Sequence, residues 1–373
     1  MTTVGVIGGG QLAWMMAKEA PTIGVKLMVQ TPDEHDSAVS LADKIIPAPV
    51  TSLSGTKELA QYCDVITFEN EFVDLEGLQK LADEGVCFRP SLQSLAPLLD
   101  KYDQRTFLAD LGLPVPKFKA LKGAGDCQEF GFPVVLKARR HGYDGQGTIV
   151  VRNNTELNSA LAQLHHTDVL IEEFIPFERE LAVIAARSVT GEIVIYPVVE
   201  TYQKNQICHW VIAPTKLSLS QQKTVENIAQ TLLRALDYVG VMGIELFLTK
   251  EGNILVNETA PRTHNSGHYT LDGCITSQFA LQLQAVTGKP FTKLNLLGRG
   301  ALMVNLLGHN NPDTDYELKL NQLSKIPHSF IHWYNKKGTR LGRKLGHITI
   351  ILHSENIEDE AKDIIKQIEA IWN

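Results

Sequence analysis

Gly243-Ile-Glu-Leu-Phe-Leu-Thr-Lys-Glu-Gly-Asn-Ile-Leu-Val-Asn-Glu258 is the stretch that decides the fold of this chain. Two runs rich in apolar and β-branched residues flank a polar turn at Thr249 to Gly252, which predicts an antiparallel hairpin. Each strand carries one glutamate, Glu245 in the first and Glu258 in the second. Whether the two carboxylates can act together depends on the register of the hairpin.

The simplest register places both glutamates on one face. If Leu248 lies opposite Asn253, then Glu245 faces Val256, and Glu258 lies one diagonal step away on the same side. Diagonal neighbours in an antiparallel pair are ~7–8 Å apart, close enough for two carboxylates to reach one ion.

The same face would carry Phe247 and Ile254, so part of it should be buried. Two ionised carboxylates there repel each other and are poorly solvated, unless a cation or a proton relieves them. Oxygen ligands without a nearby cysteine favour Mg²⁺ over zinc, and Mg²⁺ normally completes its shell with substrate phosphates. The pair predicts a metal and nucleotide site; the alternative is an exposed face with two solvated glutamates.

A glycine-rich run, Arg139-Arg-His-Gly-Tyr-Asp-Gly-Gln-Gly147, lies between expected strands that begin at Val134 and Thr148. Its glycines permit a tight connection whose backbone N–H groups can surround phosphate oxygens. It is not a Walker A loop, because no Gly-Lys-Ser/Thr follows. Lys137 ends the preceding strand and could place its ammonium on a nucleotide phosphate. A purely structural hairpin is the alternative.

The N-terminal Gly8-Gly-Gly10 follows a β-branched run and precedes a helical stretch, as in a dinucleotide-binding turn. Ala13 stands at the third glycine position, and no acidic residue ends the second strand, so the motif is only partial evidence for NAD. A helix N-terminus still favours anions, so a phosphorylated small substrate could bind at this turn.

Near the C-terminus, Lys336-Lys-Gly-Thr-Arg-Leu-Gly-Arg-Lys344 places five cations within nine residues. Such a cluster can bind a phosphate monoester through a bidentate arginine, or it can be a solvated basic turn.

Composition narrows the class of protein. A chain of 373 residues exceeds one ordinary core, so two or three domains are expected. Hydrophobic content of 44% and charged content of 21% are typical of globular proteins. The net charge of −7 argues against a nucleic-acid partner. Without a signal-peptide or membrane-spanning pattern we expect a cytoplasmic protein with no membrane partner, and the five scattered cysteines should be packing residues.

The pattern divides the chain into three parts. Residues 1–98 alternate as an α/β Rossmann-like layer, residues 99–294 mix strands and helices as α+β, and residues 295–373 form a small, β-rich end. Expected strands lie at 4–7, 27–29, 65–67, 134–137, 148–152, 169–174, 181–187, 194–199, 300–307 and 347–352. Expected helices lie at 11–20, 155–165, 220–239 and 357–371, with another running through Lys101 and Gln104.

Four stretches make the chain resemble the N5-carboxyaminoimidazole ribonucleotide synthases, a family of ATP-grasp ligases in purine biosynthesis, over essentially its whole length. They are Gly8-Gly-Gly-Gln-Leu12, Gly142-Tyr-Asp-Gly145, Asn257-Glu-Thr-Ala-Pro-Arg-Thr-His-Asn-Ser-Gly-His268 and Gly342-Arg-Lys-Leu-Gly-His347. The third is the most specific, because it couples the expected metal carboxylate directly to a substrate-recognition stretch.

The resemblance implies an ATP-grasp architecture with a pre-ATP-grasp N-terminal domain, a central ATP-grasp domain whose glycine-rich lid spans about 115–170, and a small C-terminal domain. It implies a ligase that carboxylates 5-aminoimidazole ribonucleotide with bicarbonate and ATP, through carboxyphosphate, to give N5-carboxyaminoimidazole ribonucleotide, ADP and phosphate. ATP and Mg²⁺ would be the cofactors, and the enzyme would be a homodimer.

It also implies the site. The ATP site would comprise Lys101, Lys137, Gly142, Tyr143, Asp144, Gly145, Gln146, Gly147, Thr148, Glu172, Glu173, Phe174, Ile175, Glu180, Gln203, Asn257 and Glu258. The ribonucleotide would contact Gln11, Leu12, Glu71, Arg262, His264, Asn265, Ser266, Lys336, Arg343 and Lys344. Glu245 and Glu258 would bind Mg²⁺, and the catalytic groups would be Tyr143, Asp144, His264 and Lys344.

Two departures from the family stand in this site: Gln146 replaces the usual Arg or Lys of the loop, and Thr201-Tyr-Gln203 replaces a frequent Asn-x-His.

Three other functions stay open. A formate-dependent glycinamide ribonucleotide transformylase-like ligase shares the glycine-rich start and the basic C-terminal turn. An NAD-dependent dehydrogenase is suggested only by the N-terminal glycines, and a non-catalytic ATP-binding module would bind without turnover.

Overall fold

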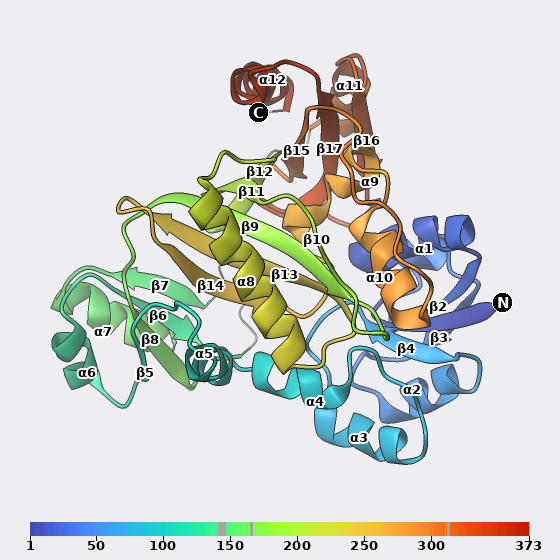
Figure 1. Cartoon of the computed structure of the whole chain (residues 1–373), viewed down its shortest axis with the longest axis horizontal. Coiled ribbons are helices and arrows are strands. Elements are labelled where there is room, and N and C mark those ends of the chain that lie inside the picture. The colour runs from blue at the N-terminus through green and yellow to red at the C-terminus, as the bar shows by residue number, and fades with distance from the viewer. Residues whose placement is uncertain (141–146, 165–166, 310, 312–313, 373) are drawn as a thin grey trace.

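The computed structural model describes residues 1–140, 147–164, 167–309, 311 and 314–372. Within these residues the chain forms three sheets (Figure 1). The N-terminal sheet lies on one side of a large central sheet, and a small sheet lies on the other. The predicted mixture of α/β and α+β layers is confirmed.

The N-terminal sheet is parallel throughout, in the order β3-β2-β1-β4. Val4 and Val6 of the central strand are fully buried, because helices cover both faces of such a sheet. Its elements are β1 (Thr2–Ile7), α1 (Gln11–Glu19), β2 (Val25–Thr31), β3 (Lys44–Pro47), α2 (Leu53–Ala60), β4 (Val65–Phe68) and α3 (Leu75–Asp83).

Two helices lead from this sheet to the next one, α4 (Leu92–Leu95) and α5 (Lys101–Asp110), which is the helix predicted through Gln104. The Asp100 carboxylate begins α5 by accepting the backbone N–H groups of Tyr102 and Asp103. Lys101 is therefore fixed in the first turn of a capped helix.

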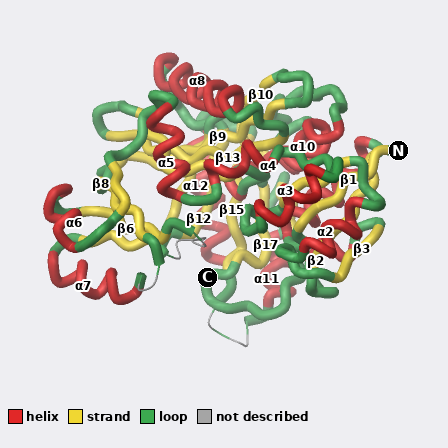
Figure 2. The backbone as a smooth tube through the Cα atoms, turned by 90° about the horizontal axis from the view of Figure 1, so that it is seen from below, coloured by secondary structure: helices red, strands yellow, loops and turns green. Residues whose placement is uncertain are grey.

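The small sheet is antiparallel, in the order β5-β8-β6-β7. Lys137 at the end of β6 pairs with Thr148 at the start of β7. Figure 2 shows this sheet and its two helices set off at one side of the molecule. The elements are β5 (Phe118–Ala120), α6 (Ala124–Phe130), β6 (Val134–Ala138), β7 (Thr148–Val151), α7 (Asn154–Gln163) and β8 (Val169–Glu173).

The central sheet joins nine strands in the described part of the chain, in the order β14-β13-β9-β11-β12-β15-β17-β16, with β10 paired to β9. Strands β15, β16 and β17 follow the predicted domain boundary at residue 295 and still belong to this sheet, so the C-terminal strands extend the sheet that carries the hairpin. The strands are β9 (Phe177–Arg187), β10 (Ile193–Ile195), β11 (Val199–Lys204), β12 (Ile207–Ala213), β13 (Gly240–Thr249), β14 (Ile254–Ala260), β15 (Gly300–Leu307), β16 (Ser329–Trp333) and β17 (Lys344–Leu352).

Helices cover the central sheet on both faces. The long helix α8 (Leu219–Ala235) packs Leu232 and its neighbours against one face of β9 and β13. Helix α10 (Gln278–Thr287) covers the other face and also packs Phe279 and Leu283 into the core of the N-terminal sheet, so it ties the two sheets together. The remaining helices are α9 (Thr270–Gly273), α11 (Tyr316–Leu323) and α12 (Ile357–Trp372).

One predicted strand, at 194–199, is wrong as a single element. The structure divides it into β10 and β11, and Pro197 lies in the gap, where a residue without an N–H cannot continue a ladder. Strands β3, β5, β12 and β16 were not predicted. No helix among the described residues has the length and apolarity needed to cross a membrane.

Candidate active site

A cavity of about 900 Å³ is lined by residues of the small and central sheets and of the segments that follow β1 and β4 of the N-terminal sheet. It collects every predicted site residue that the structure describes, with the exception of Gly147, whose carbonyl accepts a hydrogen bond from Ala138. Gly142, Tyr143, Asp144, Gly145 and Gln146 fall outside the described residues. The lining set is Gln11, Leu12, Glu71, Lys101, Lys137, Thr148, Glu172, Glu173, Phe174, Ile175, Glu180, Gln203, Glu245, Asn257, Glu258, Arg262, His264, Asn265, Ser266, Lys336, Arg343 and Lys344.

The hairpin that places the two glutamates forms, but its predicted register is wrong. Leu248 pairs with Ile254, and a shift in the register between Glu245 and Leu246 then brings Glu245 directly opposite Glu258. The shift marks a β-bulge, in which an extra residue on one strand changes which side chains share a face.

The bulge has a visible effect on the second strand. Asn257 and Glu258 are consecutive, yet both line the cavity. Val256 and Ile254 point instead into the core beneath α8, so the prediction that Ile254 shares the face of the glutamates is also wrong. Phe247 does line the cavity, as predicted.

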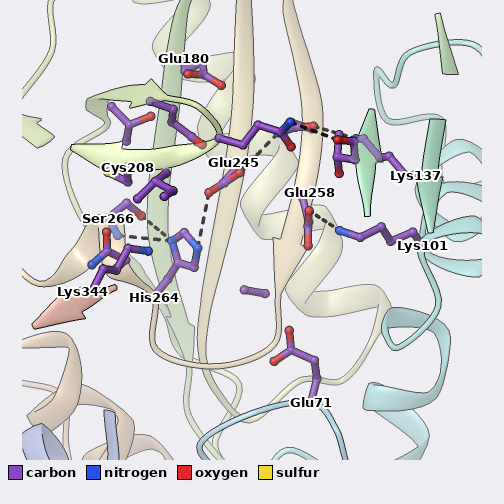
Figure 3. A pocket seen from close by; sticks show the side chains of 18 of the residues that line it. Glu71, Lys101, Lys137, Glu180, Cys208, Glu245, Glu258, His264, Ser266 and Lys344 are labelled. Carbon is purple, nitrogen blue, oxygen red and sulfur yellow. Dashed lines mark hydrogen bonds and ion pairs between the residues drawn. The ribbon is translucent and has the colours of Figure 1, made fainter. Parts of the chain in front are cut away.

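The two carboxylates are half-buried and face each other, with Lys101 and Lys137 on one side of them and His264 on the other (Figure 3). Burial raises the pKa of Glu245 to about 7, and the charge of Glu258 adds to the rise. Burial acts to raise the pKa of Glu258, but the charge and hydrogen bond of Lys101, whose Nζ lies 2.6 Å from it, together with the charge of Lys137, outweigh burial and bring that pKa to about 2. In this pair the pKa of Glu258 is therefore low, while the pKa of Glu245 lies near neutral pH.

His264 lies between the two carboxylates and the segment that follows Glu258. Its Nδ1 lies 2.8 Å from the Ser266 hydroxyl, and Nε2 lies 3.5 Å from Oε1 of Glu245. Because Nδ1 also accepts the N–H of Ser266, the ring proton resides on Nε2 and points at Glu245. Burial lowers the pKa of His264 to about 3, helped by the charges of Arg262 and Lys344. The imidazole is neutral and fixed in one orientation.

A buried ionic network positions Lys137. The Glu172 carboxylate accepts from Lys137 Nζ at 2.7 Å and from Arg105 Nε at 2.6 Å, and all three side chains are almost fully buried. Lys137 also donates to the Asn257 side chain at 3.2 Å, and that amide donates to Glu245 at 3.3 Å. Glu172 lines the cavity, and its carboxylate holds the Lys137 ammonium in position.

The other end of the cavity is built by the N-terminal sheet and the basic turn. Glu71 pairs with Arg262, with 2.6 Å from Nε to Oε2, and lies well apart from Glu245 and Glu258 in Figure 3. Gln11 accepts a hydrogen bond from Lys336, which also donates to the backbone carbonyl of Lys344. The basic turn thus closes onto the start of helix α1.

Several residues in the cavity wall or directly behind it were not predicted. Asn305 exchanges two side-chain hydrogen bonds with Asn265, at 2.8 and 3.1 Å, and orients it. Phe177 stacks on Phe247 with ring centroids 4.9 Å apart. Glu69 lies beneath the N-terminal glycines. The local sequence offered no signal for Asn305, since only the pairing of β15 with distant strands brings it to the site.

Comparison with known proteins decides the family. Family models match residues 1–97 as a ribonucleotide synthetase preATP-grasp domain, 106–279 as an ATP-grasp domain, and 301–361 as a phosphoribosylaminoimidazole carboxylase C-terminal domain. A curated relative from Synechocystis sp., N5-carboxyaminoimidazole ribonucleotide synthase, is 53% identical over 100% of this chain and 98% of its own length.

This chain belongs to the N5-carboxyaminoimidazole ribonucleotide synthase family.

Solved structures agree with this assignment to the ATP-grasp ligases. N5-carboxyaminoimidazole ribonucleotide synthetase from Thermotoga maritima is 38% identical, with a TM-score of 0.89 over 100% of this chain and 98% of that one. The Aspergillus clavatus synthase in complex with ADP and 5-aminoimidazole ribonucleotide is 30% identical, with a TM-score of 0.90 over 99% of this chain and 98% of that one. The family, the fold class and the class of enzyme expected from the sequence are confirmed.

Replacing Glu172 with Gln should destabilise the protein, because it leaves Lys137 and Arg105 buried without their shared anion. Such a loss costs about 3–5 kcal/mol at neutral pH. Lys137 and Arg105 hold the pKa of Glu172 low against burial, so its contribution is present above the ordinary carboxyl value and disappears as the pH falls through the folded-state value. Urea unfolding should therefore separate E172Q from the parent widely at pH 7 and less at acid pH. The exposed Glu178→Gln is the control, and a constant gap at all pH values would contradict the assignment.

Gly243→Ala should reduce turnover and lower the melting temperature. A Cβ at this position of β13 would lie 2.5 Å from Cβ of His264, so the imidazole and the backbone that carries it must move. Displacement by about 1 Å at a catalytic group can cost on the order of 10²-fold in rate. Steady-state kinetics and the melting temperature check this. Gly125→Ala, where a Cβ meets nothing within 4 Å, is the matched control. Unchanged kinetics in G243A would show that the position of His264 is not critical.

Proposed function

We propose that this chain carboxylates 5-aminoimidazole ribonucleotide with bicarbonate and ATP, and releases N5-carboxyaminoimidazole ribonucleotide, ADP and phosphate. The observation that carries the proposal is the continuity of one segment, Glu258 to Ser266, along a single cavity. Its first residue belongs to the acidic pair beside two lysines, and its last residues lie beside Arg262, Glu71 and the basic turn. Phosphate chemistry and ribonucleotide recognition therefore meet in one pocket.

ATP is proposed to lie on the side of the small sheet. Lys101 and Lys137 would contact its phosphates, Glu172, Glu173, Phe174 and Ile175 would line the adenine, and Glu180 would bind the ribose hydroxyls. Thr148, Gln203 and Asn257 complete the described part of this site, and the loop at 142–148 is proposed to cover the phosphates. The complex of the Aspergillus clavatus relative, named for ADP and 5-aminoimidazole ribonucleotide, supports a site for each of these two ligands.

Glu245 and Glu258 fit a Mg²⁺ ion. They lie directly opposite on paired strands, and burial together with the charge of Glu258 raises the pKa of Glu245. In the described part of the chain no third His, Cys, Asp or Glu joins them in a metal-binding group, and two carboxylates suit an ion that completes its shell with phosphate oxygens. When bound there, Mg²⁺ would neutralise charge that develops on the phosphoryl oxygens.

Carboxylation is proposed to occur in two steps. A bicarbonate oxygen attacks the γ-phosphorus of ATP, the bond to the β-phosphate oxygen breaks, and carboxyphosphate and ADP form. Lys101 and Lys137 supply fixed positive charge to this transfer. The exocyclic amine of the ribonucleotide then attacks the carboxyl carbon, directly or after CO₂ is released in the closed site, and phosphate leaves. Tyr143, Asp144, His264 and Lys344 are proposed as the groups that orient the intermediate or take the amine proton.

The ribonucleotide is proposed to lie at the opposite end, against Gln11, Leu12, Glu71, Arg262, His264, Asn265 and Ser266, with Lys336, Arg343 and Lys344 on its 5′-phosphate. The close approach of Lys336 to Gln11 supports this, because it brings the basic turn to the same wall as the N-terminal residues.

We further propose three domains, with limits at 1–98, 99–294 and 295–373, a homodimeric assembly and a cytoplasmic location. The homodimer is proposed because enzymes of this fold are commonly dimers. The five cysteines form no disulfide, which suits a reducing compartment. Light scattering on the purified protein would test the dimer.

Phosphate release in bicarbonate buffer should depend on 5-aminoimidazole ribonucleotide, because the amine consumes an intermediate that the closed site protects from water. We expect little release from ATP alone and stoichiometric release when the ribonucleotide is added. Replacing bicarbonate with formate, and the ribonucleotide with glycinamide ribonucleotide, should abolish turnover. Equal rates with and without 5-aminoimidazole ribonucleotide would overturn the substrate assignment, and turnover with formate would favour the transformylase-like alternative.

Glu258→Gln should lower turnover by roughly 10²–10³-fold, the range seen when one group that stabilises transition-state charge is removed. Its melting temperature should stay close to that of the parent, because the side chain is half-buried and outside the core clusters. Glu251→Gln, in the exposed turn of the same hairpin, is the matched control. Near-normal activity in E258Q would refute the metal role.

A further inference from the structure

The N-terminal glycine turn occupies the place where a Rossmann-like sheet binds a nucleotide phosphate. Strand β1 is central, β2 lies on one side and β4 on the other. The crevice at the carboxyl ends of β1 and β4 is the point where the strand order reverses, and the N-terminus of α1 opens onto it. Backbone N–H groups there favour an anion.

That place, called the nucleotide seat below, is already filled by a carboxylate of the chain itself. Glu69 follows the last residue of β4, and its side chain is only 9% exposed. Oε2 accepts the N–H of Gly10 at 2.7 Å and Oε1 accepts the N–H of Leu12 at 3.1 Å. The donors that would bind a phosphate are thus satisfied internally.

The glycines of the turn fit this internal anion. A Cβ at Gly8 or at Gly10 would lie 2.5 Å from an oxygen of Glu69. The absence of side chains at these positions makes room for the carboxylate of Glu69. A second anion at the same place would meet its charge at close range.

Glu69 also governs what α1 presents to the cavity. Gln11 and Leu12 are the first two residues of the helix, and both line the cavity next to Lys336 of the basic turn. Glu71, two residues after Glu69, pairs instead with Arg262. The segment Phe68-Glu-Asn-Glu-Phe72 therefore uses one carboxylate to fix α1 and the other to fix Arg262.

We propose that Glu69 is a positioning residue, an internal anion that fills the nucleotide seat of the N-terminal sheet and sets Gln11 and Leu12 against the ribonucleotide. The second half of this proposal rests on the proposed function. The first half, that the seat holds a carboxylate, does not depend on the substrate.

The test compares Glu69→Gly with Glu69→Gln. Removing two hydrogen bonds to a charged group should raise KM for 5-aminoimidazole ribonucleotide about 10-fold or more, while KM for ATP changes less than about twofold, because ATP lies on the other side of the cavity. Sodium acetate should restore E69G, since acetate can enter the vacated seat. It should not restore E69Q, whose amide fills the seat but presents an N–H to one of the two backbone donors. The exposed Glu58→Gln controls for the loss of charge.

Melting temperatures separate this proposal from the proposed function. Acetate should raise the melting temperature of E69G and leave that of the parent unchanged, whatever the substrate is. If acetate stabilises neither protein, or if both KM values rise together, Glu69 has only a general structural role and the proposal is overturned. If E69G does not fold, E69Q decides: a rise confined to KM for the ribonucleotide supports the proposal, and equal shifts refute it. Failure of the proposed function would appear separately, as a parent whose phosphate release ignores the ribonucleotide.

Discussion

The direct opposition of Glu245 and Glu258 is the constraint on which the rest of the site depends. Two like charges facing each other on paired strands destabilise a sheet, and half-burial makes the repulsion stronger. The structure surrounds the pair with positive and polar groups: Lys101 contacts Glu258, while Asn257 and His264 contact Glu245. Lys137 in turn pairs with Glu172 of the small sheet, and Asp100 fixes the start of the helix that carries Lys101 by capping α5.

The β-bulge beside Glu245 explains how a single strand serves both ends of the cavity. In a regular strand, Asn257 and Glu258 would point to opposite faces. The irregular register turns both into the cavity, so that Asn257 links Lys137 to Glu245 while Glu258 faces Lys101. The chain then continues through Ala260 and Arg262 to His264 without leaving the cavity wall. Local irregularity of the ladder thus lets one strand and its continuation line the cavity from the acidic pair to Arg262 and His264.

The features that the sequence predicts well are those set by local periodicity. The hairpin, the strand at Gly300–Leu307 and the amphipathic helix at the C-terminus follow from alternation or from a three-to-four residue repeat. The register of the hairpin could not be predicted, because a bulge is selected by packing on both faces: Ile254 and Val256 belong to the core under α8. Asn305 was missed for a related reason, since its role comes from its position beside Asn265 and not from its own neighbours. That the motif residues share one site could be predicted from the family resemblance, because the resemblance carries tertiary information that residue spacing alone does not contain.

The N-terminal turn shows why a glycine motif does not by itself define a nucleotide site. The glycines supply room and donors, but the chemistry of the seat depends on the residue that the neighbouring strand delivers to it. In this chain β4 delivers Glu69, and the two N–H groups at the start of α1 receive a carboxylate from within the protein. A helix that needs no external anion is ordered before any substrate binds, and its first side chains can then recognise another part of the ligand. The sheet retains the geometry of a phosphate site, while the carboxylate of Glu69 converts it into a fixed support for the cavity wall.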